Sequence, residues 1–241
     1  WTRDAAQAAE INEKRLNSKY CGATVLPPAI RATTSLTEAV DGAGLVLVII
    51  PSKAFRSVAR ELGALVTPDQ YVVHGTKGLE AGTHKRMSEL LLEETCARQV
   101  GVLGGPNIAN EILAGTPAGT VAASRFPRVV EAVREALASP RFRVFGSADV
   151  AGVEYAGSFK NVVAIAAGVA HAMELGENLN AMLVTRGLGE IATVGTRLGA
   201  QPETFFGLAG IGDLVVTCAS HHSRNHRLGV ALAKGATLQQ A

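Results

Sequence analysis

The chain has 241 residues, 47% of them hydrophobic, so it is long enough for one large domain or two small ones with a substantial core. Its formal net charge is +2 and its lysines and arginines are scattered, which excludes a broad basic surface for nucleic acid or membranes. The three cysteines, Cys21, Cys96 and Cys218, lack CxxC spacing, which argues against a disulfide framework or structural zinc and favours a cytoplasmic location. No apolar run approaches the roughly 18 residues of a membrane span, and the first residues do not resemble a signal peptide.

The first half of the chain alternates between helical and strand patterns. We expect helices over residues 4–19, 51–65, 83–97, 106–113 and 128–138, and strands over 24–26, 44–50, 71–74, 99–103, 120–123 and 142–145. The continuous apolar run at 44–50 predicts a strand buried on both faces. Apolar strands separated by helices predict an α/β fold with a doubly wound parallel sheet, Rossmann-like, with helices on both faces.

The second half of the chain is predicted to be all-helical. A long alanine- and glycine-rich helix over 150–175 is followed by helical patterns at 180–198, 210–218 and 225–234. We place a dinucleotide-binding domain at 1–147 and a helical substrate-binding and catalytic domain at 148–241, with the long helix as its spine. The chain begins at Trp1, without a methionine, so we expect the first strand of the sheet to be missing upstream.

Three turns follow predicted strands and carry small residues or cations, at 51–55, 75–80 and 104–109. Ligands of doubly wound sheets bind beyond the carboxyl ends of the strands. Each turn alone is more often an ordinary connection, but three in succession indicate a binding edge. The dinucleotide fingerprint GxGxxG follows no predicted strand. The glycines at 207–212 resemble it but lie among helical patterns, so we expect close helix packing there and a helix start near Asp213.

A lysine and an amide stand side by side in the long apolar helix, at Lys160 and Asn161. A lysine that is desolvated or close to other cations can be neutral near pH 7 and accept a hydroxyl proton. Asp213 would position this amine, and Asn161 would orient a hydroxyl or carbonyl group. The alternative is a solvated Lys160–Asp213 pair on a helix surface.

A predicted helix N-terminus carries Arg224 between a serine and an asparagine. The guanidinium, the free backbone N–H groups and the helix dipole are the ingredients of a phosphate site. The alternative is an ordinary N-cap with a surface arginine. His221, His222 and His226 have no carboxylate or cysteine at ligand spacing, so we expect a solvent-exposed loop and helix start there, and no metal site.

An ordered series of short motifs runs from one end of the chain to the other. They are VIIPS at 48–52, TKGLE at 76–80, GPN at 105–107, FKNV at 159–162, TRGL at 185–188, GIGDL at 210–214, TC at 217–218 and SRN at 223–225. In this series the chain resembles the bacterial NAD(P)-dependent glycerol-3-phosphate dehydrogenases. The resemblance implies a two-domain enzyme that uses NADH or NADPH to reduce dihydroxyacetone phosphate to sn-glycerol 3-phosphate for phospholipid synthesis.

The resemblance also implies roles for individual residues, with Lys160 as the proton acceptor and Lys77 in contact with both substrate and cofactor. The implied catalytic residues are Lys160, Lys77, Asp213 and Asn161. The implied substrate contacts are Lys77, Gly105, Asn107, Lys160, Asp213, Ser223, Arg224 and Asn225, and the implied cofactor contacts are Arg3, Phe55, Lys77, Ala109 and Arg224. The family's opening strand and C-terminal helical portion have no counterpart, so we expect roughly the middle three-quarters of the enzyme.

Two other functions stay open at this point. One is a similar two-domain dehydrogenase of β-hydroxyacids or ketopantoate, against which the serine-arginine-asparagine cluster argues because it favours a phosphorylated substrate. The other is a non-catalytic nucleotide-sensing or oligomerisation module. Arg3 favours NADPH through an expected contact with its 2′-phosphate, but one arginine does not decide between the cofactors. The glycine- and alanine-rich helices can pack within one chain or between chains, so a homodimer is also open.

Overall fold

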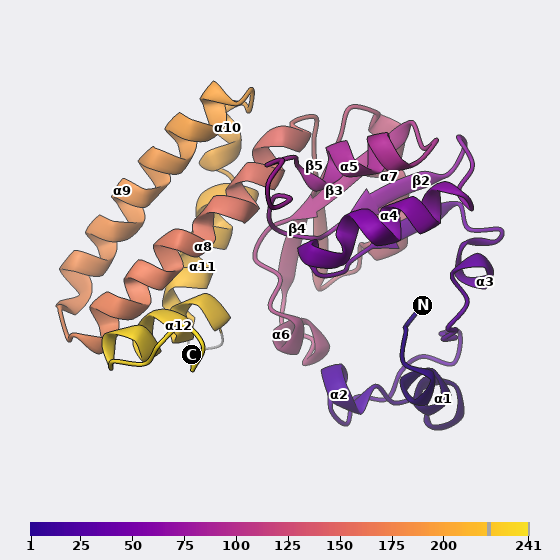
Figure 1. The fold of residues 1–241 in the computed structure, drawn as a ribbon, viewed down its shortest axis with the longest axis horizontal. Helices are drawn as coiled ribbons and strands as arrows, with labels where there is room; N and C mark the ends of the chain where they lie inside the picture. The colour runs from indigo at the N-terminus through magenta and orange to yellow at the C-terminus, as the bar shows by residue number, and fades with distance from the viewer. Residues whose placement is uncertain (221–222, 241) are drawn as a thin grey trace.

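The computed structural model describes residues 1–220 and 223–240, and an α/β part is followed by a helical part (Figure 1). The α/β part contains α1 (Ala5–Lys14), α2 (Ser18–Cys21), α3 (Leu36–Val40), β1 (Leu45–Val48), the 3₁₀ turn η1 (Ser52–Ala54), α4 (Phe55–Gly63), β2 (Tyr71–His74), α5 (Met87–Glu94), β3 (Gln99–Gly104), α6 (Ala109–Leu113), β4 (Ala118–Ser124), α7 (Pro127–Leu137) and β5 (Phe142–Ser147). The helical part contains α8 (Val150–Ala172), α9 (Gly176–Arg197), α10 (Pro202–Phe205), the π-helix η2 (Leu208–Gly212), α11 (Asp213–Ala219) and α12 (Arg224–Ala233).

The five strands form one sheet in the order β1-β2-β3-β4-β5. The pairs β1–β2, β2–β3 and β4–β5 are parallel, whereas β3 and β4 are antiparallel. The predicted fold class is confirmed, with a correction at this one pair. A parallel neighbour needs a crossover that packs on a face of the sheet. The short helix α6 lies beyond the end of the sheet instead (Figure 1), so the chain returns beside β3 in the opposite direction.

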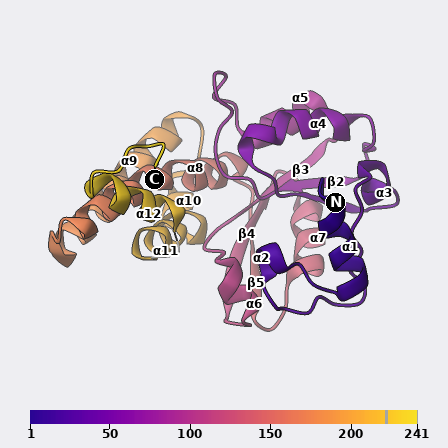
Figure 2. The same cartoon turned by 60° about the horizontal axis from the view of Figure 1, so that its bottom comes forward.

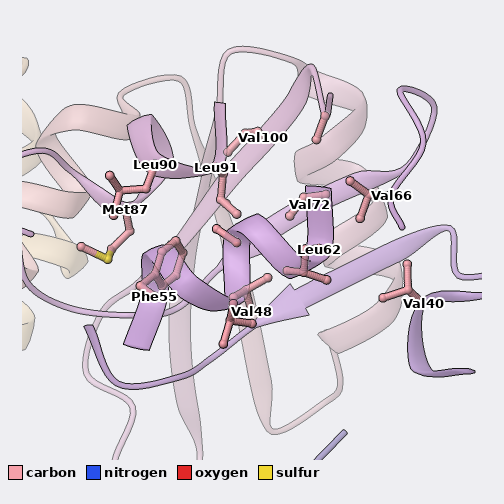
Figure 3. Packing of buried hydrophobic residues seen from close by; sticks show 13 residues of the cluster. Val40, Val48, Phe55, Leu62, Val66, Val72, Met87, Leu90, Leu91 and Val100 are labelled. Atoms are coloured by element: carbon pink, nitrogen blue, oxygen red, sulfur yellow. The ribbon is translucent and has the colours of Figure 1, made fainter. Parts of the chain in front are cut away.

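Helices cover both faces of the sheet. On one face, α4 and α5 pack on β1, β2 and β3 through a buried cluster that includes Phe55, Leu62, Leu90, Val72 and Val100 (Figure 3). On the other face, α7 packs on a second cluster that includes the neighbouring strand residue, Val73. Successive side chains of a strand point to opposite faces of the sheet, so Val72 packs in the first cluster and Val73 in the second.

The N-terminal segment differs from the prediction in two places. Residues 24–26 form no strand; Val25 is 72% exposed, and the Leu26 amide donates to the Arg15 carbonyl instead of to a neighbouring strand. The expected helix over 4–19 ends at Lys14, because Arg15 adopts a left-handed conformation with φ 59°, and the separate short helix α2 follows. Two short helices, α3 and α10, have no counterpart in the prediction.

The strand β1 is less buried than its apolar sequence predicts. It lies at the edge of the sheet, where it pairs with β2 alone, and Leu47 on it is 38% exposed. The apolar run therefore identifies the strand, and within the described residues only one of its two edges is paired.

The long helix α8 is the spine of the helical part, and α9, α11 and α12 pack around it (Figures 1 and 2). The contact between α8 and α12 depends on two glycines. A Cβ on Gly168 would lie 2.1 Å from the His226 carbonyl oxygen, and one on Gly229 would lie 2.1 Å from the Ile165 carbonyl oxygen. The two backbones therefore touch, which brings the start of α12 close to the middle of α8.

Among residues 1–220 and 223–240, no single helix is long and apolar enough to cross a membrane. One bent pair, Pro202–Ala219 with Arg224–Ala233, passes that test by length and composition alone. Cys21, Cys96 and Cys218 are all free thiols.

Candidate active site

A buried carboxylate bridges two lysines where the two parts of the molecule meet. Lys160 of α8 and Asp213 of α11 are 5% and 2% exposed. The Lys160 ammonium donates to Asp213 Oδ1 at 2.5 Å, and the Lys77 ammonium, from the turn after β2, donates to Oδ2 at 2.7 Å. Each carboxylate oxygen thus holds one ammonium group. The alternative of a solvated pair on a helix surface does not describe this arrangement.

The position of Asp213 follows from the local backbone. It is the first residue of α11 and comes directly after the π-helix η2, an irregularity that often occurs at functional sites. A Cβ on Gly210 would lie 2.1 Å from the Phe205 carbonyl oxygen, so glycine is needed for this close approach. The predicted close packing at 207–212 and the helix start near Asp213 are both confirmed.

Burial changes the acidity of the Lys160 amine. Desolvation and the positive charge of Lys77 lower the pKa of Lys160 to about 8, although Asp213 acts in the opposite direction. The amine can therefore exchange a proton near neutral pH. Burial raises the pKa of the neighbouring Cys218 thiol to about 11, even though the charge of Lys160 opposes this. Of these two groups, Lys160 is therefore the one whose pKa lies closer to neutral pH.

The turn that carries Lys77 is fixed to the strand beside it. The Thr76 hydroxyl donates to the Ile50 carbonyl at 2.7 Å and accepts from the Ile50 amide at 3.2 Å. These bonds join the turns after β1 and β2 at the carboxyl ends of the parallel strands.

On one side of the lysine pair lies a cavity of about 480 Å³. It is lined by Lys77, Asn107, Ile108, Ala109, Asn110, Lys160, Asp213, Val216, Thr217, Ser220, Ser223 and Arg224. Three cations face one carboxylate among these side chains, so the cavity favours an anion. Arg224 begins α12, and the Ser223 hydroxyl caps this helix by accepting from the His226 amide at 3.2 Å. A guanidinium at a helix N-terminus suits a phosphate group.

On the other side lies a second cavity of about 590 Å³, which shares Lys77, Lys160 and Arg224 with the first. Its remaining lining residues are Ile49, Ile50, Pro51, Ser52, Lys53, Gly75, Thr76, Asn161 and Asn225. The cavity lies beyond the carboxyl ends of β1 and β2, where doubly wound sheets bind dinucleotides. It contains cations and no carboxylate among its described lining residues, which fits the pyrophosphate of a nicotinamide cofactor. Turns after successive strands therefore line the two cavities, as the sequence predicts.

Most of the predicted site residues come together here. Asn107 lies in the first cavity, and its amide nitrogen donates to the Thr120 hydroxyl at 3.0 Å. The Gly105 carbonyl accepts from the Lys77 ammonium at 3.4 Å. Ala109 lines the first cavity, whereas Asn161 and Asn225 line the second.

The structure places two expected cofactor contacts elsewhere. Phe55 has no exposed surface, packs against His74 with the two rings nearly perpendicular, and lines neither cavity. Arg3 lies over the Trp1 ring near the N-terminus and lines neither cavity. The contacts of Phe55 and Arg3 with the cofactor both remain predictions.

Of the three histidines singled out near α12, only His226 lies in the part of the chain that the structure describes. His221 and His222 lie outside the described residues. His226 is 4% exposed and lies 5.4 Å from the His171 ring, which corrects the expectation of a solvent-exposed residue. Among residues 1–220 and 223–240, no three His, Cys, Asp or Glu side chains are grouped closely enough to hold a metal ion.

Sequence reasoning did not assign a role to Thr217. Its hydroxyl accepts from the Lys160 ammonium at 2.5 Å and donates to the Asp213 carbonyl at 2.6 Å. Thr217 follows Asp213 by four residues, so both lie on one face of α11. The four-residue spacing between Asp213 and Thr217 is the sequence signal that could have predicted that Thr217 joins the site.

Comparisons with known proteins agree with this geometry. Residues 1–130 match the family described as "NAD-dependent glycerol-3-phosphate dehydrogenase N-terminus", and residues 149–241 match its "C-terminus" counterpart. The glycerol-3-phosphate dehydrogenase [NAD(P)+] of Acinetobacter baumannii (strain SDF) is 46% identical over 241 residues, which is all of this chain and 67% of the relative.

Solved structures give the same result. The crystal structure of glycerol-3-phosphate dehydrogenase from Coxiella burnetii superposes with a TM-score of 0.93 at 34% identity, over 99% of this chain and 73% of that chain. The glycerol-3-phosphate dehydrogenase of Saccharomyces cerevisiae gives a TM-score of 0.84 at 28% identity, over 95% of this chain and 68% of that chain. The chain therefore belongs to the family of NAD-dependent glycerol-3-phosphate dehydrogenases and is an NAD(P)-dependent oxidoreductase of glycerol 3-phosphate.

Proposed function

We propose that Lys160 is the general acid and base of the reaction that interconverts dihydroxyacetone phosphate and sn-glycerol 3-phosphate. The observation that supports this most strongly is the buried bridge of Lys160, Asp213 and Lys77 between an anion-binding cavity and a cavity suited to a nicotinamide cofactor. The reduced cofactor supplies a hydride when bound. In the reductive direction, the Lys160 ammonium gives its proton to the carbonyl oxygen, and in the oxidative direction the Lys160 amine takes the hydroxyl proton.

The remaining side chains position the substrate and stabilise charge in this proposal. Asp213 holds both ammonium groups in place, and Lys77 stabilises negative charge that develops on the substrate oxygen. Arg224 and the start of α12 bind the phosphate group, and Arg224 also reaches the second cavity. Asn161 orients the hydroxyl or carbonyl group. Substrate contacts are further assigned to Gly105, Asn107, Ser223 and Asn225, and cofactor contacts to Lys77, Ala109 and Arg224. Of the two cavities, Asn225 lines only the second and Ala109 only the first, so these two assignments require ligands that extend past the lysine pair.

The roles are divided between two domains in this proposal. Residues 1–147 form the dinucleotide-binding domain, and residues 148–241 form the helical domain that binds the substrate and carries Lys160. The end of the sheet at Ser147 and the start of α8 at Val150 support this division. The substrate then contacts both domains, through Lys77 on one side and Arg224 on the other.

We also propose a cytoplasmic homodimer that supplies glycerol 3-phosphate for phospholipid synthesis. The three free thiols support a reducing compartment. Met182 and Val194 on α9 and Leu198 directly after it are apolar and about half exposed, which supports a contact between chains. Sedimentation of the purified protein tests the dimer, because a single species of monomer mass contradicts it.

A substrate panel tests the proposed reaction. The complete polypeptide is assayed with dihydroxyacetone phosphate, ketopantoate and a β-oxoacid, each with NADH and with NADPH. We expect turnover only with the phosphorylated ketone, because three cations line the cavity beside Lys160. Turnover with an oxoacid in preference to dihydroxyacetone phosphate contradicts the assignment. Binding of a cofactor without any turnover would instead favour a nucleotide-sensing module.

A further inference from the structure

A buried carboxylate on α8, six residues before Lys160, is the strongest feature that the proposed reaction does not use. Glu154 is 6% exposed, although ionised side chains are seldom buried without partners. Its Oε1 accepts from the Ser88 amide at 2.8 Å, and its Oε2 accepts from the Ser88 hydroxyl at 2.6 Å and from Arg86 Nη1 at 2.9 Å. The His74 ring nitrogen Nε2 lies 3.1 Å from Oε1, close enough for an ion pair but without the alignment of a hydrogen bond.

All of these partners belong to the α/β part of the molecule. His74 ends β2, and Arg86 and Ser88 lie at the start of α5. Burial opposes ionisation of Glu154, but the contact with His74 and the hydrogen bonds from Ser88 outweigh it and lower the pKa of this carboxyl. Glu154 is therefore a charged side chain that fastens α8 to the sheet and to α5.

Ser158, one turn further along α8, makes a second connection between this helix and the α/β part. The Ser158 hydroxyl accepts from the Gly78 amide at 3.1 Å and donates to the Glu154 carbonyl at 2.7 Å. Gly78 is the neighbour of Lys77, and the Lys77 side chain runs along α8 at Gly157, where an added Cβ would lie 3.6 Å from its Cγ.

The contacts of Glu154 and Ser158 fix the two segments that carry Lys77 and Lys160 relative to each other. Lys77 follows His74 by three residues, and Lys160 follows Glu154 by six residues, about 9 Å along the helix axis. The two amines reach the two oxygens of one carboxylate, at 2.7 Å and 2.5 Å, so a small displacement of α8 would break one of these contacts.

We propose that Glu154 is a positioning residue, which sets the separation of Lys77 and Lys160 by fastening α8 to β2 and α5. Catalytic contact is not part of this role, since Glu154 lines neither of the two cavities. The proposal rests on the proposed role of Lys160, because the separation matters for turnover only if that amine transfers the proton.

The charged and titratable groups around Lys160 and Glu154 decide in which direction the pKa of Lys160 shifts when Glu154 is replaced. Lys160 faces Lys77 from the turn after β2, Asp213 and Cys218 from α11, and shares its cavities with Arg224 from α12. Glu154 faces His74 and Arg86, and Arg86 also pairs with Glu89 at 3.1 Å. The charge of Lys77 lowers the pKa of Lys160, so a shift of Lys77 away from it raises that pKa.

The test measures the Lys160 amine directly in the complete polypeptide without cofactor. Acetic anhydride labels lysines only in their neutral form, and peptide mass spectrometry across a pH series gives the pKa of Lys160. We expect Glu154→Gln to raise this value by about one unit and to lower kcat tenfold or more, since misplacement by about 1 Å can cost on the order of 100-fold. Ser158→Ala leaves no buried charge unpaired, and we expect a smaller shift in the same direction.

Asp149→Asn is the matched control, because Asp149 is a second buried carboxylate at the start of α8. Its carboxylate accepts from the Gly152 and Gln201 amides and from the Thr204 hydroxyl, and these three residues all lie in the helical part. We expect this variant to lower Tm and to leave the pKa of Lys160 unchanged.

The proposal is overturned if Glu154→Gln and Ser158→Ala lower Tm as Asp149→Asn does but leave the labelling profile of Lys160 unchanged. If Glu154→Gln does not fold, the profile of Ser158→Ala decides alone. Turnover that survives Lys160→Ala would refute the proposed proton transfer. The labelling profiles would still decide whether Glu154 sets the position of the two amines.

Discussion

At the scale of single residues, the proposed role of Lys160 predicts how the rate of each direction of the reaction depends on pH. Below its pKa of about 8 the group is an ammonium, which donates the proton for reduction, and above it the group is an amine, which accepts the proton for oxidation. We therefore expect kcat/KM for glycerol 3-phosphate oxidation to rise with pH and level off above about 8, and kcat/KM for reduction to fall over the same range. Profiles in both directions that lack opposite inflections between about pH 7 and 9 would contradict this assignment.

A second prediction at the residue scale concerns the phosphate group. Arg224 lines both cavities, whereas Arg227 is an exposed arginine on the same helix that lines neither. Hydrogen bonds to charged groups contribute about 1.5–3 kcal/mol, so Arg224→Ala should raise KM for dihydroxyacetone phosphate roughly tenfold or more. Steady-state kinetics of both variants provide the check. Equal effects of Arg224→Ala and Arg227→Ala would argue against phosphate binding at α12.

At the scale of elements, the contact between α8 and α12 places Arg224 beside Lys160. A Cβ on Gly229 would lie 2.1 Å from the Ile165 carbonyl oxygen, so Gly229→Ala forces the two helices apart. Overpacking of this kind typically costs about 1–3 kcal/mol, and we expect a lower Tm and weaker substrate binding. In α9, a Cβ on Gly189 meets nothing within 4 Å, so Gly189→Ala should raise stability by about 0.5–1 kcal/mol. Thermal unfolding in which both substitutions have the same sign would show that this packing account is wrong.

The elements also show what a sequence pattern can and cannot predict. The apolar runs at β1, β2 and β3 and the long helix α8 are visible in the sequence because their periodicity reflects local geometry. The antiparallel direction of β4 depends on where α6 lies in space, and the missing strand at residues 24–26 depends on the lack of a partner. Neither of these is encoded in a short window of sequence.

At the scale of the whole molecule, the site joins residues that are far apart in the chain. Lys77 and Asp213 are separated by 136 positions in the sequence, yet Lys77 Nζ lies 2.7 Å from Asp213 Oδ2. The residue types at these positions, together with the family resemblance, predicted that they belong to one site. The bonds from Glu154 to Arg86 and Ser88 could not be predicted, because they form only when α8 packs against α5.

In the proposed site, substrate contacts come from both parts of the molecule, so ligand binding should stabilise the whole fold. At about 100 times Kd, a ligand that binds only the native state adds about 2.7 kcal/mol. We therefore expect glycerol 3-phosphate to raise Tm of the complete polypeptide, and Arg224→Ala to reduce this increase. Differential scanning calorimetry with and without the ligand gives the answer. An unchanged Tm at saturating ligand would contradict binding between the two parts.

The most direct test of the account is turnover by Lys160→Ala in the complete polypeptide. The account predicts that reduction of dihydroxyacetone phosphate is abolished, while a fluorescence titration shows nearly unchanged binding of NADH or NADPH. The matched control is Lys234→Ala, which removes an exposed lysine that follows α12 and should leave turnover unchanged. Turnover of Lys160→Ala that equals the unsubstituted enzyme would contradict the central role of this buried amine.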